Sequence, residues 1–323
     1  MKSKIFITRK LPKAVEDKLE PYFEINVNEE NRVLTHSEIV EGTKKADILL
    51  CLLNDNIDAE VLKVNPNLKG VCNYAVGYNN IDIKTATDCG VPVTNTPGVL
   101  TETTADMAWA LIFSIARRIV EADRFCREER FVGWSPLLFL GSDIHEKTLG
   151  IIGAGRIGTS VAKRAAGFNM NVLYYDRNDN KDLDKLDFVQ KTDLETLLKN
   201  VDFLSLHTPL LPSTKKLIGE KEFQMMKSSA YLINTSRGKC LDEKALVVAL
   251  NNNEIAGAAL DVFYDEPKIN SDLLKMDNVV LTPHIASGSV ETRTKMGLLA
   301  AKNAIQIIRE EKPQCLVNPD YKK

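Results

Sequence analysis

Short apolar runs rich in Val, Ile and Leu alternate along the chain with stretches in which apolar residues recur at helical spacing. Such alternation is typical of a parallel sheet covered by helices on both faces. The runs form two series, one on each side of a long helical stretch. They predict strands at 4–8, 24–27, 47–52 and 69–72 in the first series, and at 148–152, 171–175, 201–206, 230–234, 256–260 and 279–281 in the second.

Helices are predicted between these strands. Two of them are long: 101–124, where apolar residues recur at four-residue steps, and 291–309, which follows the last strand. We expect both long helices to lie where the chain crosses between domains. Thr192 and Glu195 form a capping box, a pattern that predicts the start of another helix. Shorter amphipathic stretches predict helices at 12–20, 37–42 and 58–64.

Composition narrows the class of protein. The chain has 323 residues, which is long enough for two domains. Its 42 Lys and Arg against 44 Asp and Glu give a net charge of −2, which argues against a basic surface for nucleic acid or membranes. The longest stretches without a charged residue are 13 residues, too short to cross a bilayer, and the first residues do not resemble a signal peptide. We therefore expect a cytoplasmic protein that binds neither nucleic acid nor membranes.

The six cysteines are scattered, with neither a Cys-x-x-Cys pair nor a cluster with His at metal spacing. We expect no metal site and no disulfide. Cys240 lies three residues after Arg237, but no general base accompanies it in the sequence, so a structural role is expected.

The glycine pattern Gly153-Ala-Gly155-Arg-Ile-Gly158 follows an apolar run and begins a helical stretch. In such a turn the first glycine permits the sharp bend, the second lets the backbone approach a pyrophosphate, and the third lets the helix pack close to the strand. Asp176 ends the next predicted strand, where a carboxylate can bind the adenosine ribose. The acid favours NAD(H), but the adjacent Arg177 could pair with a 2′-phosphate, so NADP(H) stays possible. The alternative is an ordinary turn with a solvated aspartate.

This turn lies near the middle of the chain, after about 150 residues of other α/β pattern. The position predicts a dinucleotide-binding domain inserted into a discontinuous partner. We therefore expect an α/β protein with two doubly wound parallel-sheet domains. A Rossmann NAD-binding domain would cover 101–285, and a flavodoxin-like substrate domain would be formed by 1–100 and 286–323.

Three polar residues follow late strands, at the edge where α/β sheets bind their ligands. Arg237 follows the strand 230–234, Glu266 follows 256–260, and His284 follows 279–281. Taken singly, each has a structural explanation. The arginine could bind a carboxylate within the protein, the glutamate before proline could be a turn residue, and one histidine of four indicates nothing by itself.

Together with the glycine turn, these residues resemble the D-isomer-specific 2-hydroxyacid dehydrogenase family, over nearly the whole chain. Within it the chain is most similar to glyoxylate/hydroxypyruvate reductases. The segments that carry this closer similarity are 76–82, 101–106 and 133–141, the last of which contains Trp134. The matching segments are Val76-Gly77-Tyr-Asn-Asn-Ile-Asp82, Asn95-Thr-Pro-Gly98, Thr101-Glu-Thr-Thr104-Ala-Asp106, Gly153–Gly158, His207-Thr-Pro-Leu210, Asn234-Thr-Ser-Arg237-Gly, Asp261-Val-Phe and Thr282-Pro-His284.

The resemblance implies NAD(P)H-dependent reduction of a small 2-oxo acid, glyoxylate or hydroxypyruvate, to the D-2-hydroxy acid, glycolate or D-glycerate. Hydride would come from C4 of the nicotinamide and the proton from His284. Arg237 would bind the substrate carboxylate bidentately, and Glu266 would keep His284 protonated and oriented. The backbone amides of Val76 and Gly77 would bind the same carboxylate.

The resemblance also assigns cofactor-binding residues. Asp261 would hold the nicotinamide carboxamide and Asp176 the ribose, and His207 would line the groove. The other cofactor residues would be Thr104, Gly153, Gly155, Arg156, Ile157, Gly158, Arg177, Thr208, Pro209, Thr235 and Ser287. His36 and His145 lie in polar stretches and are expected to be solvated.

Several alternatives stay open at this point. A D-lactate or D-3-phosphoglycerate dehydrogenase would belong to the same family, and a non-catalytic NAD(H)-sensing corepressor would share the fold. Trp134 could be an ordinary core residue or part of a dimer interface, because the resemblance implies a homodimer.

Overall fold

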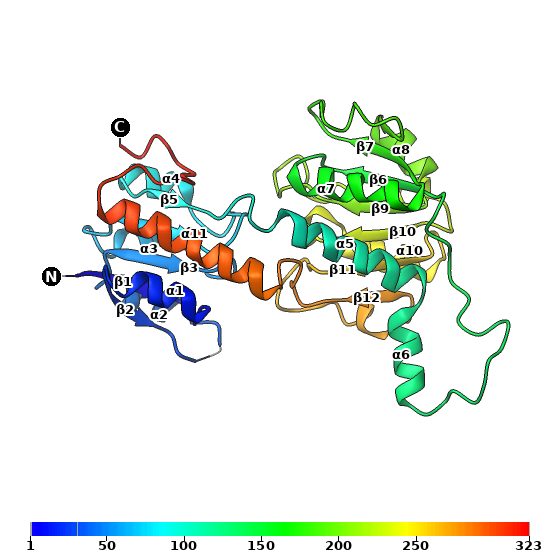
Figure 1. The fold of residues 1–323 in the computed structure, drawn as a ribbon, viewed down its shortest axis with the longest axis horizontal. Helices are drawn as coiled ribbons and strands as arrows, with labels where there is room; N and C mark the ends of the chain where they lie inside the picture. Colours follow the sequence, from blue (N-terminus) through cyan, green and yellow to red (C-terminus); the bar gives the residue numbers. More distant parts are fainter. Residues whose placement is uncertain (1, 31, 323) are drawn as a thin grey trace. The chain divides into compact units, whose positions relative to one another are not determined.

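The computed structural model describes residues 2–30 and 32–322 and divides the chain into two compact units. The first comprises Met1–Leu100 and Gly288–Lys323, and the second comprises Thr101–Ser287 (Figure 1). The first unit is therefore made from both ends of the chain. No helix among the described residues is both long and apolar enough to cross a membrane.

The first unit contains a five-stranded sheet in which every pairing is parallel, in the order β2-β1-β3-β4-β5. The central strands β3 and β4 are buried at every position, whereas β2 at the edge alternates between exposed positions and buried or half-buried ones. Burial on both faces explains why the central strands are continuous apolar runs. The strands are β1 Ser3–Ile7, β2 Phe23–Val27, β3 Ile48–Cys51, β4 Gly70–Asn73 and β5 Val93–Thr94.

Helices cover both faces of this sheet. One face buries a cluster that includes apolar side chains of α2, α3 and α4. On the other face α11 returns from the C-terminal end and packs against α1 and β4. A Cβ at Gly297 would lie 2.3 Å from Val15, so α11 approaches α1 closely at that glycine. The helices are α1 Lys13–Leu19, α2 His36–Thr43, α3 Ala59–Lys63, α4 Ile83–Asp88 and α11 Val290–Ile308.

The second unit contains a seven-stranded parallel sheet in the order β12-β11-β10-β9-β6-β7-β8. The chain winds from β6 toward β8 and then restarts at β9 on the other side of β6. Ligands of open α/β sheets bind at such a switch point, outside the carboxyl ends of the strands. The strands are β6 Thr148–Ile152, β7 Asn171–Tyr175, β8 Val189–Lys191, β9 Phe203–Leu206, β10 Tyr231–Asn234, β11 Gly257–Leu260 and β12 Val279–Leu281.

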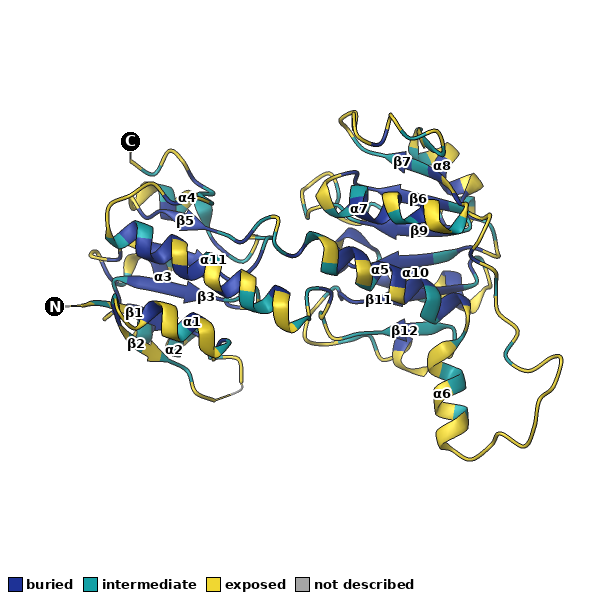
Figure 2. Ribbon diagram, viewed as in Figure 1, coloured by how far each residue is buried: buried dark blue, intermediate teal, exposed yellow. Residues whose placement is uncertain are grey.

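Helices α5 and α7 pack on one face of this sheet, and α8, α9 and α10 pack on the other (Figure 2). Both units are therefore doubly wound, and the predicted fold class is confirmed. The helices are α5 Thr101–Ala116, α6 Ile119–Arg127, α7 Arg156–Arg164, α8 Leu194–Asn200, α9 Glu220–Met225 and α10 Glu243–Asn251, with short 3-10 turns η1 Ala165–Phe168, η2 Gly238–Cys240 and η3 Leu273–Lys275.

The predicted helix 101–124 is wrong as a single element. It is divided into α5 and α6 by Arg118, whose φ of 52° is left-handed. Two contacts account for the break. The Ala116 carbonyl accepts a hydrogen bond from the Ser142 amide, and Arg118 pairs with Glu121. Apolar spacing continues through the break, so the pattern alone does not reveal it.

The predicted capping box at Thr192 is also wrong. Asp193 begins α8 instead, because its carboxylate accepts the Thr196 amide at 2.8 Å. Carboxylates are as effective as hydroxyls at this position, and the two candidates are adjacent in the sequence. The short strands β5 and β8 were not predicted from the pattern.

Candidate active site

The three candidate catalytic residues lie in the second unit, just after neighbouring strands. Because β10, β11 and β12 are adjacent and parallel, their carboxyl ends place Arg237, Glu266 and His284 along one edge of the sheet. His284 Nδ1 lies 2.7 Å from Glu266 Oε2. The structure therefore pairs the histidine with the carboxylate, although 18 residues separate them in the chain.

His284 is held in a conformation that side chains rarely adopt. Its φ is 54°, which costs energy for a residue other than glycine. Asp261, which is fully buried, supports this turn: its carboxylate accepts the Thr282 hydroxyl and the amides of Ile285 and Ala286 at 2.6–2.8 Å. The turn aims Nδ1 at Glu266 and leaves Nε2 available to a reacting group.

Glu266 has opposing influences on its ionisation. Burial alone would raise the pKa of its carboxyl group. The hydrogen bond and charge of His284 outweigh that effect, together with the amide of Phe263, which lies 3.0 Å from Oε1, and the charge of Arg237. The pKa of Glu266 is therefore held below its ordinary value. The carboxylate is ionised at neutral pH and can serve as the counter-ion of an imidazolium.

Arg237 is fixed from both sides. Its Nη1 donates to the Ser236 carbonyl at 2.7 Å, and its own carbonyl accepts the Asn234 amide group at 3.1 Å. Burial lowers the pKa of its guanidinium group, while the charge of Glu266 raises it. A Cβ at Gly238 would lie 1.9 Å from the backbone of Phe263, so only glycine permits this close approach. The arginine is thereby held against the segment that carries Glu266.

The glycine turn has the shape of a pyrophosphate site. Gly153 has a φ of 94°, and a Cβ there would lie 2.8 Å from the backbone of His207. A Cβ at Gly158 would lie 2.1 Å from the Gly153 carbonyl, so the helix packs tightly on the strand. Nothing lies within 4 Å of a Cβ at Gly155, and α7 begins at the next residue without a side-chain cap. Space and uncapped amides are therefore present where an anion would bind.

Asp176 contacts this turn directly. Its carboxylate accepts the amide of Ala154 at 2.8 Å and that of Asn178 at 2.9 Å. Arg177 donates to the Ser213 hydroxyl. The acid therefore lies against the glycine turn, and the arginine follows it in the chain.

Two buried polar atoms near the same strand ends have no hydrogen-bond partner among the described residues: Thr235 Oγ1 and His207 Nδ1. Thr235 follows β10 and His207 follows β9, the strand next to the switch point. An orphaned hydroxyl and ring nitrogen at this place fit a site that is completed by a polar ligand. Together with the open space at Gly155, they indicate that the residues present suit a dinucleotide.

His207 itself does not suit proton transfer. Its Nε2 lies 2.8 Å from the Ser205 hydroxyl, and burial lowers its pKa to about 3. The ring is therefore neutral at ordinary pH, which agrees with a role in lining a groove. Cys240 is fully buried and within 3.6 Å of the Thr208 hydroxyl, in agreement with a structural role.

The remaining predicted residues occupy varied positions. Thr104 is buried on α5, Pro209 follows Thr208 in the segment after β9, and Ser287 is the last residue of the second unit. Val76 and Gly77 belong to the first unit, so they are described apart from the residues above.

The groups that hold Val76 and Gly77 were not predicted from the sequence. Their carbonyl groups accept hydrogen bonds from the side chains of Asn95 and Asn73, each at 2.8 Å. Both asparagines end or follow strands of the first sheet, and Asn73 is fully buried. The sequence signal that could have revealed this support is an asparagine directly after an apolar run, such as Asn73 after 69–72.

The structure excludes one of the two alternatives for Trp134 and refines the expectation for His36, whose side chain is partly exposed. Trp134 is 85% exposed, so it is not a core residue. His36 is not simply solvated, because its Nε2 lies 3.0 Å from Asp58. Among residues 2–30 and 32–322, no group of three or more His, Cys, Asp or Glu side chains is arranged to hold a metal ion.

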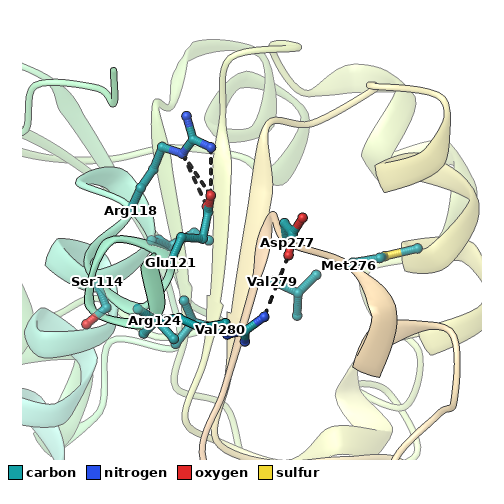
Figure 3. A pocket seen from close by; sticks show the side chains of 10 residues that line it. Ser114, Arg118, Glu121, Arg124, Met276, Asp277, Val279 and Val280 are labelled. Carbon is teal, nitrogen blue, oxygen red and sulfur yellow. Dashed lines mark hydrogen bonds and ion pairs between the residues drawn. The ribbon is translucent and has the colours of Figure 1, made fainter. Parts of the chain in front are cut away.

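A separate cavity between α5, α6 and the start of β12 does not suit a substrate (Figure 3). Its volume is about 20 Å³, which holds little more than one water molecule. Its charged side chains are paired with each other, Arg118 with Glu121 and Arg124 with Asp277. The strand ends of the second sheet are therefore the better candidate.

Comparison with known proteins finds a family that matches most of the second unit. The family described as D-isomer specific 2-hydroxyacid dehydrogenase, NAD binding domain, matches residues 109–286. Glyoxylate reductase of Korarchaeum cryptofilum is 50% identical over 100% of this chain and 98% of its own. The corresponding enzyme of Thermococcus litoralis is 48% identical over 99% of this chain and 98% of its own.

Solved structures extend the similarity. The NADPH-dependent glyoxylate/hydroxypyruvate reductase of Sinorhizobium meliloti, in complex with NADP and malonate, has a TM-score of 0.88 and 30% identity. The match covers 99% of this chain and 98% of that chain. A glyoxylate reductase of Paecilomyes thermophila has a TM-score of 0.86 and 29% identity, over 98% of each chain.

Proposed function

Because this chain belongs to the D-isomer specific 2-hydroxyacid dehydrogenase family, we propose that it reduces glyoxylate or hydroxypyruvate with NADH, giving glycolate or D-glycerate. The chain is an NAD(P)-dependent enzyme that acts on small 2-oxo acids. The observation that carries the more specific proposal is the His284–Glu266 pair, 2.7 Å apart, at the same sheet edge as Arg237.

Three residues of the chain perform the reaction around the cofactor. A bound nicotinamide supplies the hydride to the carbonyl carbon. The Arg237 guanidinium binds the substrate carboxylate, whose planar shape matches its own. His284 donates the proton from Nε2 to the carbonyl oxygen, and ionised Glu266 holds the other ring nitrogen. The contribution of the Val76 and Gly77 amides to carboxylate binding stays a prediction.

An assay of cofactor oxidation tests this function. The purified chain is given NADH or NADPH with glyoxylate, hydroxypyruvate, pyruvate and 3-phosphohydroxypyruvate, and chiral analysis identifies the product. We expect the highest kcat/KM with one of the first two acids and a D-product from hydroxypyruvate. A preference for pyruvate or for the phosphorylated acid would indicate a D-lactate or D-3-phosphoglycerate dehydrogenase instead. Absence of turnover with all four would favour a binding protein.

Asp176→Asn is expected to weaken the preference for NADH. The amide keeps an acceptor for the Ala154 backbone, but it loses the charge that repels a 2′-phosphate. Hydrogen bonds to charged groups contribute about 1.5–3 kcal/mol, so the ratio of kcat/KM for NADH over NADPH should fall ~10- to 100-fold. Steady-state kinetics with both cofactors measure it.

Arg177→Ala in the Asp176→Asn background is the matched control. We expect it to reverse part of the gain with NADPH, because Arg177 is then the nearest cation to the phosphate. An unchanged ratio in Asp176→Asn would remove Asp176 from the ribose site.

The chain is also proposed to form a homodimer. The segment after α6 exposes a run of apolar side chains, with Val132 98% exposed, and it is exposed over most of its length in Figure 2. Exposed apolar patches of this kind mark interfaces. These side chains are Phe131, Val132, Trp134, Leu137 and Leu140.

Trp134→Glu is therefore expected to shift the chain from dimer toward monomer. Sedimentation velocity over a range of concentrations measures the change. Val248→Glu, at an exposed apolar position on α10, is the control and should leave the mass unchanged. A parent chain that sediments as a monomer at all concentrations would contradict the dimer.

A cytoplasmic location likewise stays a prediction.

A further inference from the structure

Glu243 is a buried acid whose position the proposed reaction does not explain. It is the first residue of α10 and only 8% exposed. Acids at helix starts usually cap the helix, but here Asp242 already does so by accepting the amides of Lys244 and Ala245. Asp242 also binds Lys216 at 2.9 Å. The helix therefore does not need the Glu243 side chain as its cap.

The Glu243 carboxylate instead contacts the segment that carries Glu266. Its Oε1 accepts the backbone amide of Tyr264. The preceding backbone amide, that of Phe263, donates to Oε1 of Glu266 at 3.0 Å. Oε2 of Glu266 then binds His284. Two successive backbone amides thus connect Glu243 to the catalytic pair.

The same segment is restrained on its other side. The backbone of Phe263 lies so close to Gly238 that a Cβ there would clash at 1.9 Å. Phe263 therefore packs against Gly238, the residue after Arg237. The next contact that restrains the segment is the hydrogen bond from the Tyr264 amide to Glu243. If the Tyr264 amide lost its acceptor, a buried donor would be left unsatisfied and the segment would shift toward water.

Electrostatics argue against a purely stabilising role for Glu243. Burial raises its pKa, the hydrogen bond from the Tyr264 amide offsets part of that rise, and the charges of Asp265 and Glu266 add to it. Glu243 lines a surface cavity together with Lys216 and Lys244, but Lys216 is paired with Asp242. A buried carboxylate among acids destabilises the fold when it ionises, so its stability contribution falls as pH rises. What Glu243 contributes is its hydrogen bond to Tyr264.

We propose that Glu243 is a positioning residue: by holding the Tyr264 amide it fixes the turn 263–266 and hence the direction in which Glu266 meets His284. The proposal rests on the proposed function for its kinetic consequences. It adds a residue on α10 to the group that determines the rate, without contact to substrate or cofactor.

The test compares Glu243→Ala and Glu243→Gln with the parent. A misplacement of about 1 Å in an active site can cost ~10²-fold, so the alanine variant should lower kcat about 10- to 100-fold with little change in the KM of the 2-oxo acid. The alkaline limb of its pH profile should move to lower pH, because the imidazolium loses part of its counter-ion. Glutamine offers the same acceptor and should restore both to within about threefold of the parent, since its only loss is a charge that the site disfavours.

Glu222→Ala is the matched control. Glu222 also accepts a backbone amide at a helix start, that of Gly219 at 3.0 Å, but on α9. It should lower the melting temperature without changing kcat or the pH profile. If Glu243→Ala behaves like Glu222→Ala, the positioning role is wrong. Glu243→Leu, which fills the buried space while leaving the amide unpaired, replaces the alanine variant if that one does not fold.

An NMR titration of the histidine rings tests the proposal independently of turnover. The His284 signal is assigned with His284→Asn. In Glu243→Ala we expect its titration midpoint to lie below that of the parent, and in Glu243→Gln to match the parent. Equal midpoints in all three would overturn the positioning role even if the parent reduces 2-oxo acids. A shifted midpoint in a chain without turnover would contradict the proposed function alone.

Discussion

Replacing His284 by asparagine is expected to lower kcat for 2-oxo acid reduction by about 10²–10⁴-fold, the usual contribution of a general acid. Asparagine is chosen because it tolerates the left-handed backbone at this position, where φ is 54°. The Asp261 network can then stay intact. Its side chain cannot deliver a proton, so the loss should appear in kcat. Stopped-flow measurement of NADH oxidation in a single turnover checks it.

The control for this variant is His36→Asn, which removes another histidine that is paired with a carboxylate. It should leave kcat unchanged, because His36 on α2 pairs with Asp58 at the start of α3 and with none of the proposed substrate or cofactor residues. NADH binding, followed by fluorescence, should be the same in both variants. An activity of His284→Asn within a few-fold of the parent would assign the proton to another group.

The pH dependence of the parent follows from Glu266. Burial acts to raise the pKa of this carboxyl group, but His284 and the Phe263 amide outweigh burial and hold the pKa below its ordinary value of 4.5. Its contribution to stability is therefore fully present above that ordinary value and is lost as pH falls through the lowered one. The acid limb of kcat/KM should accordingly lie below pH ~4.5. In His284→Asn, which removes the largest opposing influence, acid unfolding should begin at a higher pH.

The sequence predicted the fold because the central strands of both sheets are buried, and buried strands are nearly continuous apolar runs. Those at the centre, β3, β4 and β9, have no exposed position. The edge strand β8 has only three residues, none of them buried, and lacks that signal. The break at Arg118 depends on a contact between Ala116 and Ser142, which are far apart in sequence. Local spacing contains no information about such contacts.

The candidate site was predictable to the extent that its residues follow strands. Arg237, Glu266 and His284 could be assigned to one sheet edge because parallel strands end together. The residues that hold these three side chains in position could not be assigned in the same way. Asp261 was expected to contact the nicotinamide, and in the structure its carboxylate accepts a hydroxyl and two amides of the His284 turn. Glu243 lies 23 residues before Glu266 and on a helix, so only the folded backbone connects them.

The other large effect is expected for Arg237→Lys. Lysine keeps the charge, but an ammonium group cannot form two parallel hydrogen bonds with a carboxylate. Burial already lowers the pKa of the arginine. The same burial would more readily deprotonate a lysine, because an amine is a weaker base than a guanidine. Loss of one partner of a desolvated charge pair costs about 2–5 kcal/mol, which corresponds to a ~30- to 5,000-fold lower kcat/KM.

Steady-state kinetics with glyoxylate and hydroxypyruvate measure this loss, and most of it should appear as a higher KM because Arg237 binds the ground-state carboxylate as well as the transition state. Arg164→Lys is the matched control: Arg164 also binds carboxylates, those of Glu102 and Asp106, but at the far end of α7 from the glycine turn. It should leave kcat/KM unchanged. Near-parental kinetics in Arg237→Lys would mean that a point charge is sufficient, and the substrate carboxylate would then have to be bound mainly by groups other than Arg237.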